Sequence, residues 1–215
     1  LSGGEVIDCV NYASLTVKQV ASLGNTTALY PSFGGVIGCA LSYTLDDATD
    51  TTAATVITDK LTNLENRGEI KYEDNTKSFI YRPVVAGILG YTSTAASTVM
   101  TNCDNFANVS YNAIGTGTSG ANTPVSVAGV AGVFNTGTID GCDNSGDITV
   151  DGRTYTIAAG GVFGYCYNSA TTNCHNTGKV ELKSTMRTLG LMVGGFAAAI
   201  YNPNSGAVGS CHDCS

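Results

Sequence analysis

Apolar and polar residues alternate in five short segments of the chain, and the segments share one register. When a Cys or Leu upstream of each segment is position zero, positions +6 and +8 are apolar, and the odd positions around them are mostly charged or polar. This two-residue period is typical of a β-strand with one buried face, so a strand is expected in each copy. The apolar pairs are Leu15 and Val17, Ile70 and Tyr72, Val109 and Tyr111, Ile148 and Val150, and Val180 and Leu182.

A recurring phrase, Cys-x-Asn-x-Gly-x-Val, leads into each of these strands. It is clearest at residues 142–148 and 174–180, and looser copies start at Cys9, Leu64, Cys103 and Cys211. Gly or Ala at position +4 suits a bend in which the backbone is left-handed or is closely approached by another segment. Position +2 holds Asn or Asp in every copy, namely Asn11, Asn66, Asn105, Asn144, Asn176 and Asp213.

A second phrase is rich in glycine and apolar on both sides. It occupies residues 33–38, 85–90, 127–132 and 159–164, and a fifth copy at 193–198 lacks the last Gly. A strand of this kind is expected to be covered on both faces or packed closely against another backbone. Its equivalent glycines are 52, 42, 32 and 34 residues apart, at Gly35, Gly87, Gly129, Gly161 and Gly195.

Self-similarity at a period of tens of residues indicates a solenoid. We expect an all-β fold, a right-handed parallel β-helix (β-solenoid) of about five turns with variable surface loops. Two such loops are residues 41–58 and 112–125, and insertions there are cheap because each doubling of loop length costs only about 0.6 kcal/mol. Residues 1–215 then form a single β-solenoid domain, either by themselves or as a segment of a longer repeat array.

Stacked turns would place equivalent residues about 4.8 Å apart along the axis. Side-chain amides in such a column can bond one another, because an amide has both donors and an acceptor. The alternative is that each Asn only forms a turn at a strand corner. The predicted structural ladder consists of Cys103, Cys142, Cys174, Cys211, Asn66, Asn105, Asn144, Asn176, Gly35, Gly87, Gly129, Gly161 and Gly195.

The eight cysteines invite a disulfide hypothesis, but most of them fill the repeat position zero. A spacing of about 4.8 Å between equivalent Cβ atoms exceeds the usual 3.5–4.5 Å of a disulfide. We therefore expect reduced, buried thiols in the column, since free Cys is among the most buried residue types. Cys39, Cys166 and Cys214 lie off the column in this register, and their pairing stays open.

The composition of the chain limits the classes of binding partner that are expected. The net charge is −7 and the isoelectric point is about 4.6, with no basic cluster, which argues against binding nucleic acid or an anionic membrane. No run of 18 apolar residues is present, so no membrane span is expected. Only 13% of the residues are charged, and Gly, Ser, Thr and Asn are abundant, which suits turns and strand faces better than long helices.

Few residues suggest chemistry. His175 and His212 both follow a Cys of the repeat, where a metal site competes with a simple solvated strand face. The segment 211–214 holds one Cys-x-x-Cys pair, although zinc needs four ligands. Asp46, Asp47 and Asp50 form an acidic loop that is a weak candidate for Ca²⁺, without the Gly and distal Glu of an EF-hand. We assign no catalytic, cofactor-binding or metal-binding residue and expect no enzyme and no cofactor.

The two phrases together resemble the GLUG-motif repeat, roughly Gly-Gly-Leu-x-Gly followed by Cys-x-Asn-x-Gly-x-Val. The resemblance extends over residues 6–214 and is best at 155–182, while Leu64 and Ala107 depart from it. It implies a parallel β-helix of the kind found in bacterial or archaeal surface and secreted proteins, often adhesin-like. It implies no catalytic residues.

Two functions are consistent with these features. The first is a non-enzymatic structural or adhesive protein, extracellular or on the cell surface, that associates through its solenoid ends into a filament or sheath, or binds other surface proteins or glycans. The alternative is a carbohydrate-binding or polysaccharide-cleaving β-helix protein. Its stacking faces would come from Tyr43, Tyr91, Tyr165, Tyr167 and Tyr201.

Overall fold

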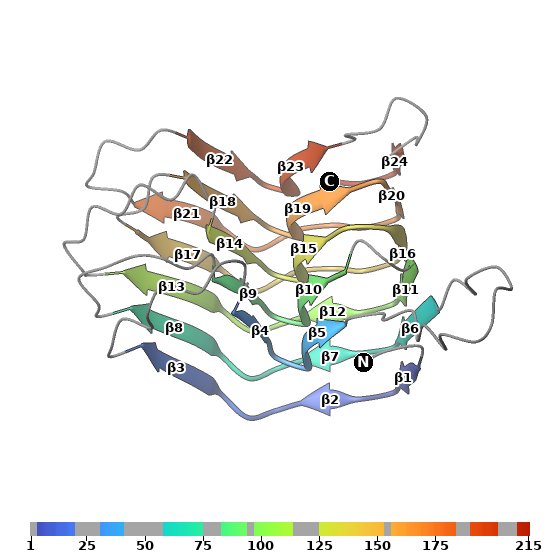
Figure 1. The fold of residues 1–215 in the computed structure, drawn as a ribbon, viewed down its shortest axis with the longest axis horizontal. Coiled ribbons are helices and arrows are strands. Elements are labelled where there is room, and N and C mark those ends of the chain that lie inside the picture. Colours follow the sequence, from blue (N-terminus) through green and yellow to red (C-terminus); the bar gives the residue numbers. More distant parts are fainter. Residues whose placement is uncertain are drawn as a thin grey trace, which may run out of the picture.

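The computed structural model describes residues 4–19, 31–40, 58–74, 83–93, 97–113, 125–152, 156–183, 190–201 and 210–215. Within these ranges the chain forms 24 strands and no helix. All strand pairs are parallel, and strands that are equivalent in the repeat lie side by side along one axis (Figure 1). The predicted all-β parallel solenoid of about five turns is confirmed.

The strands form five parallel sheets, which we name A to E in chain order. Sheet A contains β1 (Glu5–Ile7), β6 (Thr58–Thr62), β11 (Ser97–Thr101), β16 (Gly137–Asp140), β20 (Ser169–Thr172) and β24 (Ser210–His212). Sheet B contains β2 (Val10–Asn11), β7 (Glu65–Asn66) and β12 (Asp104–Asn105), and single bridges extend it to Asn144 and Asn176.

The other three sheets have five strands each. Sheet C contains β3 (Leu15–Gln19), β8 (Ile70–Asp74), β13 (Val109–Ala113), β17 (Ile148–Asp151) and β21 (Val180–Lys183). Sheet D contains β4 (Ser32–Gly34), β9 (Val84–Ala86), β14 (Val125–Ala128), β18 (Thr156–Gly160) and β22 (Gly190–Gly194). Sheet E contains β5 (Ile37–Ala40), β10 (Leu89–Thr92), β15 (Ala131–Phe134), β19 (Phe163–Tyr167) and β23 (Ala197–Tyr201).

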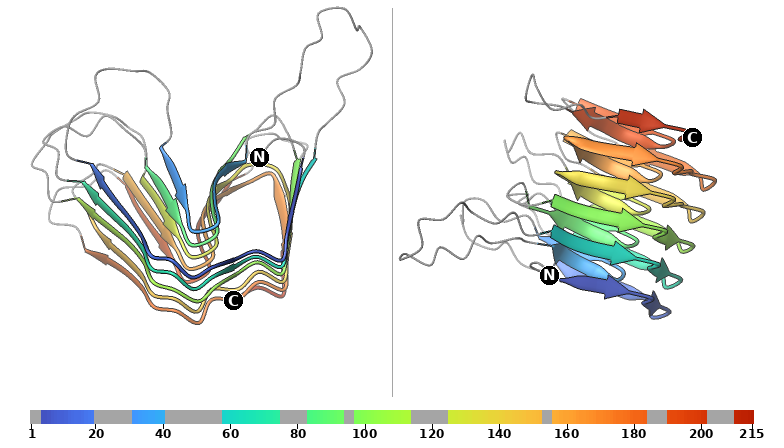
Figure 2. Two further views of the ribbon diagram at one scale, coloured as in Figure 1. Left: turned by 90° about the horizontal axis from the view of Figure 1, so that it is seen from below. Right: turned by 90° about the vertical axis from the view of Figure 1, so that its right-hand side faces the viewer.

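The cross-section of a turn is a V set inside a broad U. Sheets A, B and C form the outer contour, and sheets D and E fold back into it as a narrow V whose tip approaches sheet B (Figure 2, left). One apolar cluster joins sheets A and E, with Leu61, Met100 and Phe134 among its buried members, and we call it the A/E compartment. A second cluster, the C/D compartment, joins sheets C and D around Tyr111 and Val127.

The inner faces of the V pack against each other through a third, smaller cluster, which includes Val84, Ala158 and Tyr165. The glycine-rich phrase is therefore two strands and not one. Its first half lies in sheet D and its second half in sheet E, with a bend at the glycines between them. The expectation that both faces of this segment are covered is confirmed, because sheets D and E each contribute to two clusters.

The corner between sheets A and B has left-handed backbone at position −1 of the repeat. L-residues other than Asn and Asp rarely adopt this conformation, and Gly adopts it without cost. The column holds only these types, namely Asp8 (φ 54°), Asn63 (φ 53°), Asn102 (φ 51°), Gly141 (φ 62°) and Asn173 (φ 52°). This column was not predicted from the sequence, although an Asn, Asp or Gly before each zero position was the available signal.

The predicted register of the last copy is wrong by three residues. Cys211 pairs with Thr171, and Asp213 (φ 50°) takes the left-handed position that Asn173 has in the turn before. Cys214, and not Cys211, therefore occupies the Cys column, and His212 pairs with Thr172 instead of sharing the column of His175. The left-handed corner determines this register because the Asx residue must lie immediately before the column.

Candidate functional site

The Asn column forms a continuous hydrogen-bonded ladder through the middle of the solenoid. The Nδ2 atom of each Asn donates to Oδ1 of the Asn in the next turn, so all the amides point the same way along the axis. The four donor–acceptor distances are 2.8 Å for Asn11 to Asn66, 2.8 Å for Asn66 to Asn105, 2.7 Å for Asn105 to Asn144 and 2.6 Å for Asn144 to Asn176.

Each Asn also closes the bend that follows it. The same Nδ2 donates to the carbonyl oxygen two residues later, for example from Asn105 to Ala107 at 2.7 Å and from Asn144 to Gly146 at 2.8 Å. Asn66, Asn105 and Asn144 are almost fully buried, and each amide uses both of its donor protons. The ladder therefore satisfies buried polar groups that would otherwise cost about 1–3 kcal/mol each.

The tip of the V explains why the two sequence phrases occur together. A Cβ atom added to Gly129 would lie 2.2 Å from Cγ of Asn144 and 2.3 Å from the carbonyl oxygen of Gly161. Gly87 has the same relation to Asn105, and Gly161 to Asn176, each with an added Cβ 2.2 Å from the Asn side chain. A residue with a Cβ does not fit between the ladder and the neighbouring turn, so the Gly at the third position of one phrase is required by the Asn of the other.

The cysteine column has a geometric role beside the left-handed corner. Each thiol approaches the carbonyl oxygen two residues earlier, across the left-handed residue. The Sγ–O distances are 3.4 Å for Cys9, 3.4 Å for Cys103, 3.5 Å for Cys142, 3.1 Å for Cys174 and 3.2 Å for Cys214. A Cys side chain thus fills the corner and donates a weak hydrogen bond to its carbonyl. Leu64 fills the same position but has no donor for this bond.

All eight cysteines are free thiols in the structure, Cys39 and Cys166 included. Hydrogen bonds with the thiols of Cys103 and Cys174, together with burial, raise the pKa of Cys142 well above its usual value. Burial raises the pKa of Cys166 to about 12. The thiols of Cys142 and Cys166 therefore stay protonated at neutral pH and are poor nucleophiles, whereas the hydrogen bond with Cys142 lowers the pKa of Cys103 and of Cys174.

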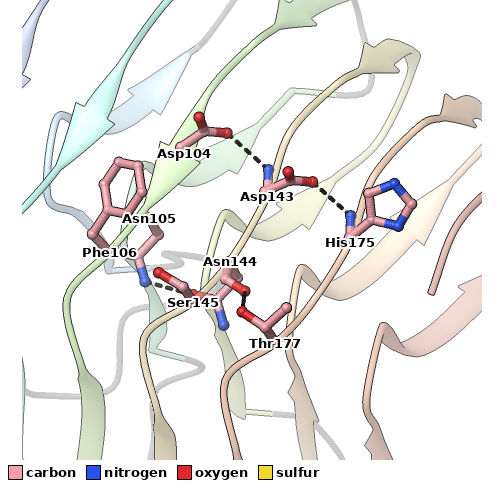
Figure 3. A pocket seen from close by; sticks show the side chains of 8 residues that line it. All are labelled: Asp104, Asn105, Phe106, Asp143, Asn144, Ser145, His175 and Thr177. Atoms are coloured by element: carbon pink, nitrogen blue, oxygen red, sulfur yellow. Dashed lines mark hydrogen bonds between the residues drawn. The ribbon is translucent and has the colours of Figure 1, made fainter.

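The outer face of sheet B carries a shallow hollow of about 180 Å³ (Figure 3). Its walls are the outward residues on both sides of the Asn column, with Asp104, Asp143 and His175 on one side and Phe106, Ser145 and Thr177 on the other. We call this hollow the sheet B groove.

The carboxylates of the sheet B groove support the backbone. Oδ1 of Asp104 accepts the N–H of Asp143 at 3.0 Å, and Oδ1 of Asp143 accepts the N–H of His175 at 2.8 Å (Figure 3). Partial burial, with the nearby carboxylates of Asp143 and Glu65, raises the pKa of Asp104 above its usual value. Nδ1 of His175 lies 2.8 Å from Oγ of Ser215.

An aromatic face is available beside these carboxylates. Phe106 is 44% exposed, and the Arg67 guanidinium lies 4.4 Å from its ring centroid. The described residues include no group of three or more His, Cys, Asp or Glu side chains that could hold a metal ion. The arrangement offers polar and aromatic contact surface, with carboxylates already engaged by the backbone.

The other predicted site residues are dispersed. Tyr91, Tyr165 and Tyr167 pack in the cluster inside the V, with the last two rings stacked at 5.8 Å, so they do not form a platform in the sheet B groove. Gly195 has no atom within 4 Å of an added Cβ, because its turn is the last in sheet D. Tyr43 and the acidic loop of Asp46, Asp47 and Asp50 lie outside the described residues, as does the side chain of Tyr201.

No protein-family model, curated protein or solved structure matches this chain. Among the residues that the structure describes, no helix is long and apolar enough to span a membrane.

Proposed function

We propose that this chain is a non-enzymatic structural or adhesive protein of the GLUG-repeat type, displayed extracellularly or at the cell surface, whose solenoid acts as a stiff rod. The observation that carries the proposal is the Asn ladder, which joins five turns by side-chain hydrogen bonds in addition to the parallel backbone ladders. Buried networks in which every member is satisfied rigidify a structure. A rod of this kind needs no active site, and its loops and faces provide contact surface.

The solenoid ends are the natural contact surfaces for assembly. Of the eight exposed large hydrophobic residues in the described part of the chain, all except Phe106 lie on the first or last turn. They are Ile7, Val10, Tyr12 and Leu15 at one end, and Leu191, Val193 and Ile200 at the other. Unpaired strand edges with apolar side chains favour pairing with another strand edge.

The polarity of the Asn ladder favours head-to-tail contact. Asn11 presents its oxygen towards one end, and Asn176, which donates one amide proton to the Gly178 carbonyl, presents its other amide proton towards the other end, because every amide donates in the same direction. A second copy that stacks head to tail continues donor to acceptor, whereas head-to-head stacking brings like groups together. A heterologous contact of this type propagates into a filament or sheath.

The sheets differ in their number of strands, and this difference affects how two copies could stack. Sheet A has six strands, whereas sheets C, D and E have five, since β24 begins a further turn. A stacked copy that pairs its β1 with β24 would meet sheet A one strand further along the axis than the last strands of sheets C, D and E. A chain that ends at residue 209 has complete turns only, so it should assemble at lower concentration than the full chain.

The test is sedimentation and electron microscopy over a concentration series. The proposal predicts rods that lengthen with concentration, and shorter rods for the double variant Val10→Lys, Val193→Lys. Thr138→Lys, on the exposed face of a middle turn, is the matched control and should assemble like the wild type. A monodisperse monomer at all concentrations, for the full chain and for the chain ending at 209, contradicts the assembly.

A second candidate, carbohydrate binding, rests on the sheet B groove. An exposed aromatic ring beside carboxylates and hydroxyls is a suitable surface for a sugar, because the ring stacks on its apolar face and the polar groups bind its hydroxyls. A glycan array with wild type and Phe106→Ala tests this. Loss of a glycan signal in the variant supports the binding function, and an absence of signal for the wild type contradicts it.

A further inference from the structure

Two thiols flank the corner that includes the end of β24, the last described strand. In the four turns before it, the residues at positions −3 and 0 of the repeat point into the A/E compartment from the two sides of the left-handed residue. All are buried: Leu61 and Leu64, Met100 and Cys103, Ile139 and Cys142, and Thr171 and Cys174. Cys211 pairs with Thr171, and Cys214 continues the column of Cys174, so both thiols face the same compartment across Asp213.

These two thiols contact each other at the open end of that compartment. Burial, followed by the side-chain hydrogen bond with Cys211, raises the pKa of Cys214 to about 11. Cys211 is exposed and Cys214 is partly buried, because no described strand stacks on β24. Cys103, Cys142 and Cys174 differ in this respect, since each of them is fully buried.

We propose that Cys211 and Cys214 form a redox-active pair that closes to an intramolecular disulfide on reaction with a small-molecule disulfide such as oxidised glutathione. The exposed Cys211 loses its proton to solvent, and its thiolate attacks the reagent, which forms a mixed disulfide and releases one glutathione thiolate. Cys214 then loses its proton, and its sulfur attacks Cys211, which forms the Cys211–Cys214 bond and releases the second glutathione. The two cysteines are oxidised, and the reagent is reduced to two thiols.

Geometry restricts the reaction to this pair. Cys166 and Cys174 lie close to it, but their side chains are buried and cannot meet a soluble reagent first. Stacked thiols of adjacent turns keep the strand spacing of about 4.8 Å, which exceeds the usual Cβ separation of a disulfide. Cys211 and Cys214 belong to the same turn and flank its left-handed corner, so the spacing between stacked strands does not separate their side chains, which are hydrogen-bonded to each other. The proposal does not depend on the function proposed above.

The experiment uses the full chain in a glutathione redox series with a chelator present. Free thiols are blocked with iodoacetamide, disulfides are reduced and labelled with N-ethylmaleimide, and peptides are identified by mass spectrometry. The expected result is that N-ethylmaleimide labels Cys211 and Cys214 together, in a chain that stays monomeric on a non-reducing gel. Cys103, Cys142 and Cys174 should carry iodoacetamide instead, and they should react with it only once the chain is unfolded.

Two variants make the result specific. Cys211→Ser should leave Cys214 either free or as a glutathione adduct, whereas Cys9→Ser, which removes another exposed thiol, should leave the pair unchanged. Lasting glutathione adducts at both positions of the wild-type chain, a crosslink between Cys214 and Cys174 or Cys166, or a disulfide-linked dimer would each overturn the proposal.

Discussion

The tip of the V touches the Asn ladder along a line that we call the contact line, and an apolar compartment lies on either side of it. The residue types allowed at equivalent positions differ between the contact line and the compartments. Along the contact line, Asn66, Asn105 and Asn144 are invariant in kind and are faced only by glycine. In the compartments, equivalent positions differ freely, as when Leu64 replaces Cys in the A/E compartment or Tyr72 stands level with Val150 in the C/D compartment.

This difference has a physical cause. The contact line joins directional hydrogen bonds to a backbone approach with no space for a Cβ, so a substitution there loses both. The compartments hold apolar side chains, whose attraction depends on area more than direction. A repeat of this kind is therefore recognisable by its polar and glycine columns, and the compartments only need the right total volume.

The largest effect is expected for Gly129→Ala. The new Cβ would meet Asn144 at 2.2 Å and the Gly161 carbonyl at 2.3 Å, so the V must move away from the ladder. We expect a loss of about 3 kcal/mol or more in the free energy of unfolding, measured by urea denaturation. The matched control is Gly190→Ala, where an added Cβ is 3.5 Å from Thr156, and where a change within about 0.5 kcal/mol is expected. Equal losses in the two variants would refute the special role of the contact line.

Asn144→Ala should have the next largest effect. It removes the acceptor of Asn105 and the donor to Asn176 and leaves the buried carbonyl of Gly146 without that donor. Because unsatisfied buried groups cost about 1–3 kcal/mol each, we expect a loss of about 3 kcal/mol by the same assay. Asn11→Ala at the open end of the ladder is the control and should cost less than about 1 kcal/mol, since water replaces the lost bonds there. If Asn144→Ala costs no more than Asn11→Ala, the ladder does not stabilise the interior.

A smaller change of opposite sign is expected in the C/D compartment. The hydroxyl of Tyr111 is buried and has no hydrogen-bond partner among the described residues. Tyr111→Phe removes that polar group and keeps the ring stacked on Tyr72 at 5.3 Å. We expect the free energy of unfolding, measured by thermal or urea denaturation, to rise by about 1 kcal/mol. A clear loss of stability would mean that the hydroxyl is satisfied by a segment that the structure does not describe.

The smallest effect is expected for Asp104→Asn in the sheet B groove. Burial raises the pKa of Asp104 in the folded chain, so the fold binds this proton more tightly than the unfolded chain does. Stability should therefore fall as the pH rises from about the usual carboxyl pKa of 3.9 through the raised value, and the loss stays constant above it. The melting temperature of Asp104→Asn, compared with wild type between pH 3 and pH 7, should fall less over this range. A parallel pair of curves contradicts the assignment.

Much of the architecture could be predicted from the sequence. The two-residue period placed the strands of sheet C, and the Cys-x-Asn column predicted the pairing of Asn105 with Asn144 and of Asn144 with Asn176. The bend at position +4 is explained by close approach, since an added Cβ on Gly146 would be 2.0 Å from the carbonyl oxygen of Ala107. The candidate site was harder to predict, because Phe106 and Asp104 belong to no motif and line the groove only together with residues of two further turns.

The sequence by itself determined which residues are equivalent, because a period records what lies above and below each residue along the axis. Only the tertiary structure decided which columns meet across a turn, that is, that the Gly at the third position of one phrase touches the Asn of the other. It also decided that the glycine phrase bends into two sheets and that Asp213, through its left-handed corner, places Cys214 in the column. Those relations depend on where the backbone bends within a turn, and bends follow from local conformation and packing that no repeat period encodes.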